Sequence, residues 1–176
     1  MVAEVKSLHA NNEEITRMRE IFDSQKLAYS QHRYPTAEER IDHLERLGPA
    51  LVKYTDEICE AMNADFGSRS VDETKIAEVM ATLEGIKYYK KLVRKGMKPQ
   101  MRHVASAQWP SSVYVSYQPK GVVGVVTPWN YPFYLALGPA LCALAAGNRV
   151  MIKMSEFTPR AGELLKKILA EVYPED

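Results

Sequence analysis

Two short loops carry the side chains of this chain that could perform chemistry. The first, Thr127-Pro128-Trp129-Asn130-Tyr131-Pro132, holds an aromatic and an amide side chain in a turn between two prolines. The second, Lys153-Met154-Ser155-Glu156, places a cation and a carboxylate three positions apart, close enough to grip a pair of vicinal hydroxyls. We therefore consider both loops as candidate ligand-binding segments.

Each of these residues also has a purely structural interpretation. Asn130 could cap the helix that follows, since asparagine is among the best capping residues. Trp129 alone would more often belong to a core, Lys153 to a solvated strand end, and Glu156 to an ordinary loop. Two motifs together carry more weight than any single residue, so their combination favours ligand binding.

Cysteine and histidine offer no further site. Cys59 and Cys142 each fall inside an apolar helical pattern, which is typical of buried, reduced thiols in a cytoplasmic protein. The histidines show no metal-ligand spacing, so no metal is expected. They are His9, His32, His43 and His103.

Composition excludes several classes of partner. The chain has 176 residues, 46% of them apolar and 26% charged, which is ordinary for a globular protein with its own core. With 23 basic and 22 acidic residues its net charge is +1, so no long-range field favours nucleic acid or a membrane surface. The longest apolar stretch, 133–146, is too short to span a bilayer, and the first residues lack the apolar core of an export signal.

The elements around the two loops predict a parallel sheet. Gly121 to Val126 is a β-branched run typical of a strand buried on both faces, and Arg149 to Lys153 is a second strand. Helices are predicted between them, from Pro132 to Gly147, and after them, from the N-cap Thr158. This strand-helix-strand-helix order places both loops at the carboxyl edge of the sheet, where ligands bind in such folds. The glycine fingerprint G-x-G-x-x-G is absent, so a diphosphate would have to be held in another way.

Helices are predicted for the first hundred residues. A cap formed by Asn11 and Glu14 would open the first helix, with Ile15, Met18 and Phe22 on one face, and a Thr36–Glu39 capping box would open the second. The second helix is expected to break or kink at Gly48-Pro49 and to end at Asp65-Phe66-Gly67. A further helix over 72–95 has its apolar face at Ile76, Val79, Met80, Leu83 and Ile86, and residues 112–117 alternate like a half-exposed strand.

The segment GVVGVVTPWNYPFYLALGPALCALAAGNRVMIKMSEFTPR, residues 121–160, resembles the aldehyde dehydrogenase superfamily, and most closely its class-3 and coniferyl-aldehyde-dehydrogenase branch. The resemblance covers roughly residues 12–176. Its most specific part is the proline-tryptophan-asparagine turn followed by Lys-x-Ser-Glu. It implies an incomplete α/β aldehyde dehydrogenase fold, in which amino-terminal helices (1–100) and a strand arm (101–120) precede the first half of a Rossmann-like NAD(P)-binding domain (121–176).

The resemblance implies specific roles for the first loop. Asn130 corresponds to the asparagine whose amide donates a hydrogen bond to the oxyanion formed when a cysteine attacks the aldehyde. Thr127, Pro128 and Trp129 correspond to the turn that lines the nicotinamide ribose and the diphosphate.

The second loop would bind the other end of the cofactor. Lys153 and Glu156 correspond to the pair that binds the adenine ribose hydroxyls, with Ser155 nearby. The family usually has proline where this chain has Met154, and its loss could loosen the conformation of Lys153. Because the Glu156 carboxylate would repel a ribose 2′-phosphate, NAD is expected, with NADP as the alternative.

For the intact protein the resemblance implies oxidation of an aldehyde to a carboxylic acid through a cysteine thioester. The catalytic cysteine and the general-base glutamate lie later in family chains, so the present chain is expected to be inactive alone. Residues 101–120 resemble an arm used in subunit association, which implies a homodimer or homotetramer. A non-catalytic module that binds a nucleotide or a partner chain remains the alternative.

Overall fold

Helices fill the first part of the chain in the computed structural model, which describes residues 12–173. They are α1 (Asn12–Gln31), α2 (Ala37–Lys53), α3 (Thr55–Phe66), α4 (Val71–Thr74), the π-helical segment η1 (Lys75–Met80) and α5 (Ala81–Gly96). The expected cap at Asn11 lies outside the described residues. The helical character predicted from the sequence is confirmed for this region.

Helix α1 lies across the strands, and polar side chains further along its expected face make the closest contacts. Met18 and Phe22 are exposed, whereas Gln25 and Tyr29 are half-buried against the strand region. The Gln25 amide donates to the Val150 carbonyl at 3.4 Å, and the Tyr29 hydroxyl donates to the Pro119 carbonyl at 2.9 Å. Gln25 and Tyr29 continue the spacing of Ile15, Met18 and Phe22, so the apolar periodicity indicated the correct face but not the polar side chains that make its contacts.

The predicted capping box of α2 is confirmed, whereas Gly48-Pro49, where a break or kink was expected, does not interrupt the helix. Thr36 accepts from the Glu39 backbone N–H, and the Glu39 side chain accepts from the Thr36 backbone in return. Pro49 lies inside α2, and the break between α2 and α3 falls at Tyr54. Leu47 and Leu51 on either side of Pro49 are fully buried, so packing keeps the helix intact despite the missing hydrogen bond.

Residues 71–96 form one continuous helical rod through α4, η1 and α5. Ile76 and Met80, expected on the buried face, are exposed, and Glu78 is buried instead. A π-helical turn is wider than an α-helical turn, so the apolar period read from the sequence slips within η1. The period is restored in α5, where Ile86 is buried.

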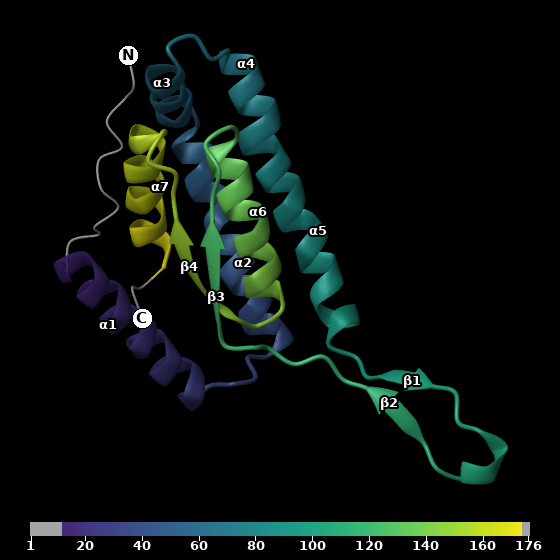
Figure 1. Ribbon diagram of the computed structural model, residues 1–176. Coiled ribbons are helices and arrows are strands. Elements are labelled where there is room, and N and C mark those ends of the chain that lie inside the picture. Colours follow the sequence, from purple (N-terminus) through teal and green to yellow (C-terminus); the bar gives the residue numbers. More distant parts are fainter. Residues whose placement is uncertain (1–11, 174–176) are drawn as a thin grey trace, which may run out of the picture.

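A hairpin arm projects from the helical body (Figure 1). It consists of β1 (Gln100–Arg102), the 3₁₀ turn η2 (Ser106–Gln108) and β2 (Val113–Val115), with the two strands antiparallel. The strand expected within 112–117 is thus confirmed over a shorter span. Both strands of the arm are exposed throughout.

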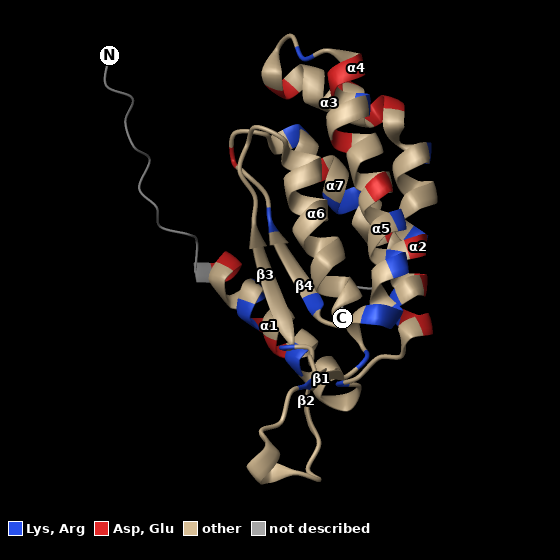
Figure 2. Cartoon of the chain, turned by 90° about the vertical axis from the view of Figure 1, so that its right-hand side faces the viewer, with Lys and Arg blue, Asp and Glu red and all other residues tan. Residues whose placement is uncertain are grey.

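The last part of the chain follows the predicted order β3 (Val122–Val126), α6 (Pro132–Ala145), β4 (Arg149–Lys153) and α7 (Pro159–Val172). Strands β3 and β4 pair in parallel, with Val126 opposite Lys153. The strands lie between α1 on one side and α6 on the other (Figure 2). The expectation that the first strand is buried on both faces is wrong, because Gly124 and Val126, which share one face of β3, are exposed.

The main core lies between α2, α3, α5, α6 and α7. Its fully buried side chains include Leu44, Leu47, Ile58, Met62, Phe133, Leu137, Leu141, Leu165 and Ile168. Burying each such side chain stabilises the fold by about 1.5–3 kcal/mol relative to leaving it in water. Over the described range, no helix has both the length and the apolar character needed to cross a membrane.

The turn between α6 and β4 depends on glycine. Gly147 has a φ of 86°, and a Cβ at this position would lie 2.7 Å from Cζ of Arg40. The guanidinium of Arg40 reaches the end of α6 and donates to the Ala145 carbonyl at 3.4 Å. Next to the glycine, the Asn148 side chain accepts from the backbone N–H of Lys120 at 2.6 Å and thereby ties the start of β3 to the start of β4.

Candidate functional site

The two predicted loops leave the same edge of the β3–β4 pair. Both strands run towards the end of the molecule where α3 and α4 lie (Figure 1). The Thr127 N–H donates to the Lys153 carbonyl at 3.0 Å, so the two loops begin side by side. The structure thus brings the Thr127–Asn130 turn and the Lys153–Glu156 loop together at the carboxyl edge of two parallel strands, the usual position of a ligand site.

The first loop presents its polar group to solvent. Asn130 is exposed, and its side-chain amide makes no hydrogen bond with any described residue. The N-cap of α6 is Tyr131, so the capping interpretation of Asn130 is wrong. Trp129 is 53% exposed, which also excludes the core interpretation, and its ring lies 6.2 Å from that of Phe66.

The remaining predicted residues of the two loops differ in exposure. Thr127 is buried, and its hydroxyl has no hydrogen-bond partner among the described residues. Pro128 follows it in an exposed position. Ser155 is buried, and its hydroxyl accepts from the Phe157 N–H at 3.3 Å, which shapes the second loop from within.

Lys153 and Glu156 form an exposed ion pair. The Lys153 Nζ donates to Glu156 Oε2 at 2.7 Å. The hydrogen bond from Lys153 lowers the pKa of Glu156, so the carboxylate is ionised at neutral pH. Because both groups are exposed, ligand hydroxyls can replace this contact, with the ammonium as donor and the carboxylate as acceptor.

Met154 occupies the position where the family usually has proline. Its side chain is half-buried against the core. A Cβ on Gly162 would lie 3.4 Å from Cβ of Met154, so the methionine packs closely on α7. This contact restrains the loop without the ring of a proline.

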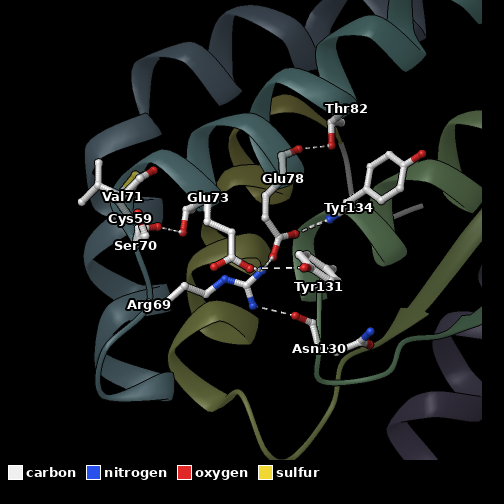
Figure 3. A network of polar contacts seen from close by, with 11 residues as sticks. Cys59, Arg69, Ser70, Val71, Glu73, Glu78, Thr82, Asn130, Tyr131 and Tyr134 are labelled. Atoms are coloured by element: carbon white, nitrogen blue, oxygen red, sulfur yellow. Dashed lines mark hydrogen bonds and ion pairs between the residues drawn. The ribbon is translucent and has the colours of Figure 1, made fainter.

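A buried polar network lies beneath the first loop (Figure 3). Arg69 Nη1 donates to the Asn130 carbonyl at 2.6 Å, and Arg69 Nη2 lies 3.6 Å from Glu78 Oε1. Glu78 Oε2 accepts from the Tyr134 N–H in the first turn of α6 at 2.8 Å. Burial raises the pKa of Glu78 above 4.5, and the N–H groups of α6 and the charge of Arg69 oppose this shift only in part.

A second carboxylate caps α7 from a distant element. Asp65 at the end of α3 accepts from the N–H groups of Arg160 at 3.2 Å and Ala161 at 2.9 Å. Thr158 is the N-cap residue, as expected, but its own side chain makes no capping hydrogen bond. The first turn of the helix that follows the Lys153–Glu156 loop is therefore held by α3.

These carboxylates occupy the helix ends at which an anion could otherwise bind. A helix N-terminus attracts a phosphate through its free N–H groups and its dipole. Glu78 occupies this position on α6, and Asp65 occupies it on α7. Neither helix therefore offers its N-terminus to a diphosphate, which agrees with the absence of a glycine fingerprint.

The site residues predicted from the sequence do not include Asp65, Arg69 or Glu78. Asp65 was noted only as part of a helix stop. Glu78 does carry a signal, because a carboxylate interrupts the otherwise apolar run Ile76-Ala77-Glu78-Val79-Met80. Arg69 offers no local signal, since it follows a turn in an otherwise ordinary polar segment.

The two cysteines differ from each other. Cys59 is buried as expected, and burial raises the pKa of its thiol. The expectation of burial is wrong for Cys142, which is exposed on α6. Among the described residues no group of His, Cys, Asp and Glu side chains could hold a metal ion.

Comparison with known proteins identifies the family. The family described as "Aldehyde dehydrogenase family" matches residues 3–176. A probable coniferyl aldehyde dehydrogenase of Pseudomonas aeruginosa is 48% identical over the whole chain, which spans 37% of that protein. A probable coniferyl aldehyde dehydrogenase of Caulobacter vibrioides is 40% identical over 90% of the chain and 33% of its own length.

Solved structures show the same fold. The substrate-bound AldH of Staphylococcus aureus superposes with a TM-score of 0.85 at 28% identity, over 90% of this chain and 34% of that one. The chain spans about a third of the length of the relatives it matches. The expected family and the expected incomplete fold are confirmed, and the chain belongs to the aldehyde dehydrogenase family.

Proposed function

We propose that this chain supplies the oxyanion-binding turn and the adenosine-ribose loop of an NAD(P)-dependent aldehyde dehydrogenase. The proposal rests on the shared sheet edge, where two adjacent loops begin side by side. One loop carries the Asn130 amide, which makes no hydrogen bond with any described residue, and the other carries the exposed Lys153–Glu156 ion pair. Thr127, Pro128 and Trp129 complete the first loop, and Ser155 completes the second.

In the proposed mechanism a cysteine thiolate attacks the aldehyde carbon, and the carbonyl oxygen becomes an oxyanion. The Asn130 amide donates a hydrogen bond to this oxygen, a contribution typically worth about 3 kcal/mol in the transition state. The carbon of the adduct then loses a hydride and becomes the thioester carbonyl, and a dinucleotide held through Lys153 and Glu156 would be the hydride acceptor. Water activated by a carboxylate then releases the acid from the thioester.

Neither cysteine of the chain suits the nucleophilic role. Cys59 is buried with a raised pKa, opposite to the lowered pKa of a reactive thiol. Cys142 is exposed near the carboxyl end of α6, away from the carboxyl edge of β3 and β4. We propose that the nucleophile and the water-activating carboxylate come from sequence outside this chain, and that the chain alone has no turnover.

The residues present fit one end of a dinucleotide. Lys153 and Glu156 provide the donor and acceptor that two vicinal hydroxyls require. The diphosphate must bind elsewhere, since the N-termini of α6 and α7 are capped by the protein's own carboxylates. The ionised Glu156 would repel a ribose 2′-phosphate, so we propose NAD as the preferred cofactor.

The test is steady-state turnover of an aldehyde by a full-length enzyme carrying this chain. Asn130→Ala should lower kcat by about 10²–10³-fold, while the Kd for NAD changes little. Glu156→Gln should improve NADP binding relative to NAD in isothermal titration. An Asn130→Ala enzyme with unchanged kcat would refute the oxyanion role, and nucleotide binding without turnover by the full-length protein would favour a non-catalytic module.

The hairpin arm supports a second proposal, that the intact enzyme is a homo-oligomer. Residues 104–119 contain no Lys, Arg, Asp or Glu, and the tip of the arm is uncharged (Figure 2). Trp109 is 82% exposed there, and Tyr114 and Tyr117 are exposed as well. Exposed aromatic side chains on an uncharged projection are typical of subunit interfaces. Trp109→Ser with Tyr114→Ser should dissociate the oligomer in sedimentation experiments.

We also propose that the enzyme works in the cytoplasm on a small-molecule aldehyde. Both cysteines are free, which fits a reducing compartment. The aromatic side chains that follow Asn130 could form one wall of an aldehyde pocket. They are Tyr131 and Tyr134, since Phe133, which the sequence also suggested, is buried in the core.

A further inference from the structure

Arg69 stands at the centre of the contacts that hold the Asn130 turn. Its side chain is only 6% exposed, and Nη1 donates to the Asn130 carbonyl at 2.6 Å. The guanidinium carbon lies 4.4 Å from the centre of the Tyr131 ring and 4.7 Å from that of Phe66. One planar group thus contacts Asn130, the residue after it, and the end of α3.

Two carboxylates lie beside the positively charged guanidinium of Arg69. Arg69 Nη2 lies 3.3 Å from Glu73 Oε1 and 3.6 Å from Glu78 Oε1, and the Glu78 side chain is fully buried. Glu73 also accepts from the Tyr131 hydroxyl at 3.2 Å. The guanidinium and these two acids therefore form one unit that contacts the loop through both backbone and side chain.

The turn is held at both ends. At its start the Thr127 N–H is bonded to the Lys153 carbonyl, and at its end the Tyr134 N–H is bonded to Glu78. Arg69 acts between these points. Its hydrogen bond draws the Asn130 carbonyl towards the network, and the Asn130 side chain points away from the network (Figure 3).

Stability alone gives little reason for this arrangement. Burying a guanidinium and a carboxylate costs desolvation free energy, and apolar residues of similar volume often serve the fold as well. A planar, stacked guanidinium with fixed N–H directions does what an apolar side chain or a lysine cannot, because it fixes the orientation of a carbonyl.

We propose that Arg69 is a positioning residue that sets the direction of the Asn130 amide, with Glu78 as its buried counter-charge. The inference rests on the proposed oxyanion role of Asn130. Arg69 acts through the backbone of Asn130 and does not itself contact the aldehyde. A small displacement of a preorganised donor can cost about 10²-fold in rate, so the effect of this residue on turnover can be large.

The test is a double-mutant cycle in a full-length enzyme carrying this chain. Arg69→Lys keeps the charge beside Glu78 and loses the planar, stacked group. We expect kcat for an aldehyde to fall by about 10–100-fold with the Kd for NAD within about twofold of the parent enzyme. In the Asn130→Ala background the same substitution should change kcat by less than about twofold, because the donor it positions is absent. Arg94→Lys, at the exposed Arg94–Glu38 pair on α5, is the matched control and should leave kcat unchanged.

The outcomes separate the two proposals. If Arg69→Lys and Asn130→Ala lower kcat multiplicatively, Arg69 does not act through Asn130 and the inference is overturned. If Asn130→Ala alone leaves kcat unchanged, the proposed oxyanion function fails first. Should Arg69→Lys not fold, Glu78→Gln replaces it, since the glutamine oxygen can still accept from the Tyr134 N–H while the counter-charge is lost. A kcat decrease that disappears in the Asn130→Ala background supports the inference, and an equal decrease in both backgrounds overturns it.

Discussion

Asp65 offers a direct test of how the helical region stabilises the sheet edge. Its two carboxylate oxygens accept from consecutive N–H groups in the first turn of α7. We predict that Asp65→Ala lowers the free energy of unfolding by about 2 kcal/mol. Loss of an N-cap costs about 0.5–2 kcal/mol, and loss of a negative charge at a helix N-terminus costs about 0.3–1 kcal/mol more.

Asp65→Asn separates the two contributions. The asparagine side chain keeps one acceptor oxygen for the first turn of α7. Its NH₂ group would face the other backbone N–H, and the negative charge of the carboxylate is lost. We expect a loss of about 1 kcal/mol, between the wild type and Asp65→Ala. Because α7 carries the buried side chains Leu165 and Ile168, a weakened first turn should reduce the stability of the whole core.

The measurement is urea denaturation at neutral pH, followed by far-ultraviolet circular dichroism, with a matched control on the same helix. Asp56→Asn removes an equal charge from α3, where the side chain is 91% exposed and 3.7 Å from Lys75. An exposed substitution of this kind usually changes stability by less than about 0.5 kcal/mol. If Asp65→Ala proves no more destabilising than Asp56→Asn, the capping role of Asp65 is wrong.

Three further predictions concern the glycine turn, the capping box and the cysteines. Gly147→Ala should lower the free energy of unfolding by at least about 2 kcal/mol, because of its positive φ and the neighbouring guanidinium, whereas Gly96→Ala, with open space around it, should not. The hydrogen bonds of the α2 N-cap lower the pKa of Glu39 from 4.5 to about 2, so its contribution to stability is present above pH 4.5 and is lost as the pH falls towards 2. Glu39→Gln should therefore reduce the melting temperature at pH 7 and show a smaller further decrease between pH 4.5 and 2, and parallel curves for the two proteins would contradict this. A thiol reagent should modify Cys142 in the folded chain and Cys59 only after denaturation, as peptide mass spectrometry can show; equal rates in the folded state would contradict the burial of Cys59.

Local patterns predicted the elements that bear the two loops. Strand β4 was predicted with its observed bounds, and the Thr36–Glu39 capping box needs only residues that are neighbours in the sequence. The same holds for the spacing of Lys153 and Glu156. The order of strands and helices then sufficed to bring both loops to one edge, because parallel strands joined by a helix leave little topological choice.

The supporting contacts could not be predicted in this way. Arg69 and Asn130 are 61 positions apart, Glu78 and Tyr134 are 56 apart, and Asp65 and Arg160 are 95 apart. Such pairs form only when whole helices pack against each other, and the spacing of apolar residues within one helix does not predict which residues of two helices will meet. The slip of the apolar period within η1 has the same origin, since a π-helical turn changes which side chains face the core.

The position of the hairpin arm in the sequence matters for protein engineering. The hairpin arm separates the helical segment that carries Asp65, Arg69 and Glu78 from the loop and helices whose backbone groups they contact. Arg69 donates to a backbone carbonyl there, and the two carboxylates accept from backbone N–H groups. An exposed arm looks like a convenient crossover point for joining segments of two related enzymes. A chimera joined there would combine these side chains from one parent with the backbone N–H and carbonyl groups of the other. It would fold with a well-formed sheet edge only where those backbone groups lie in matching positions.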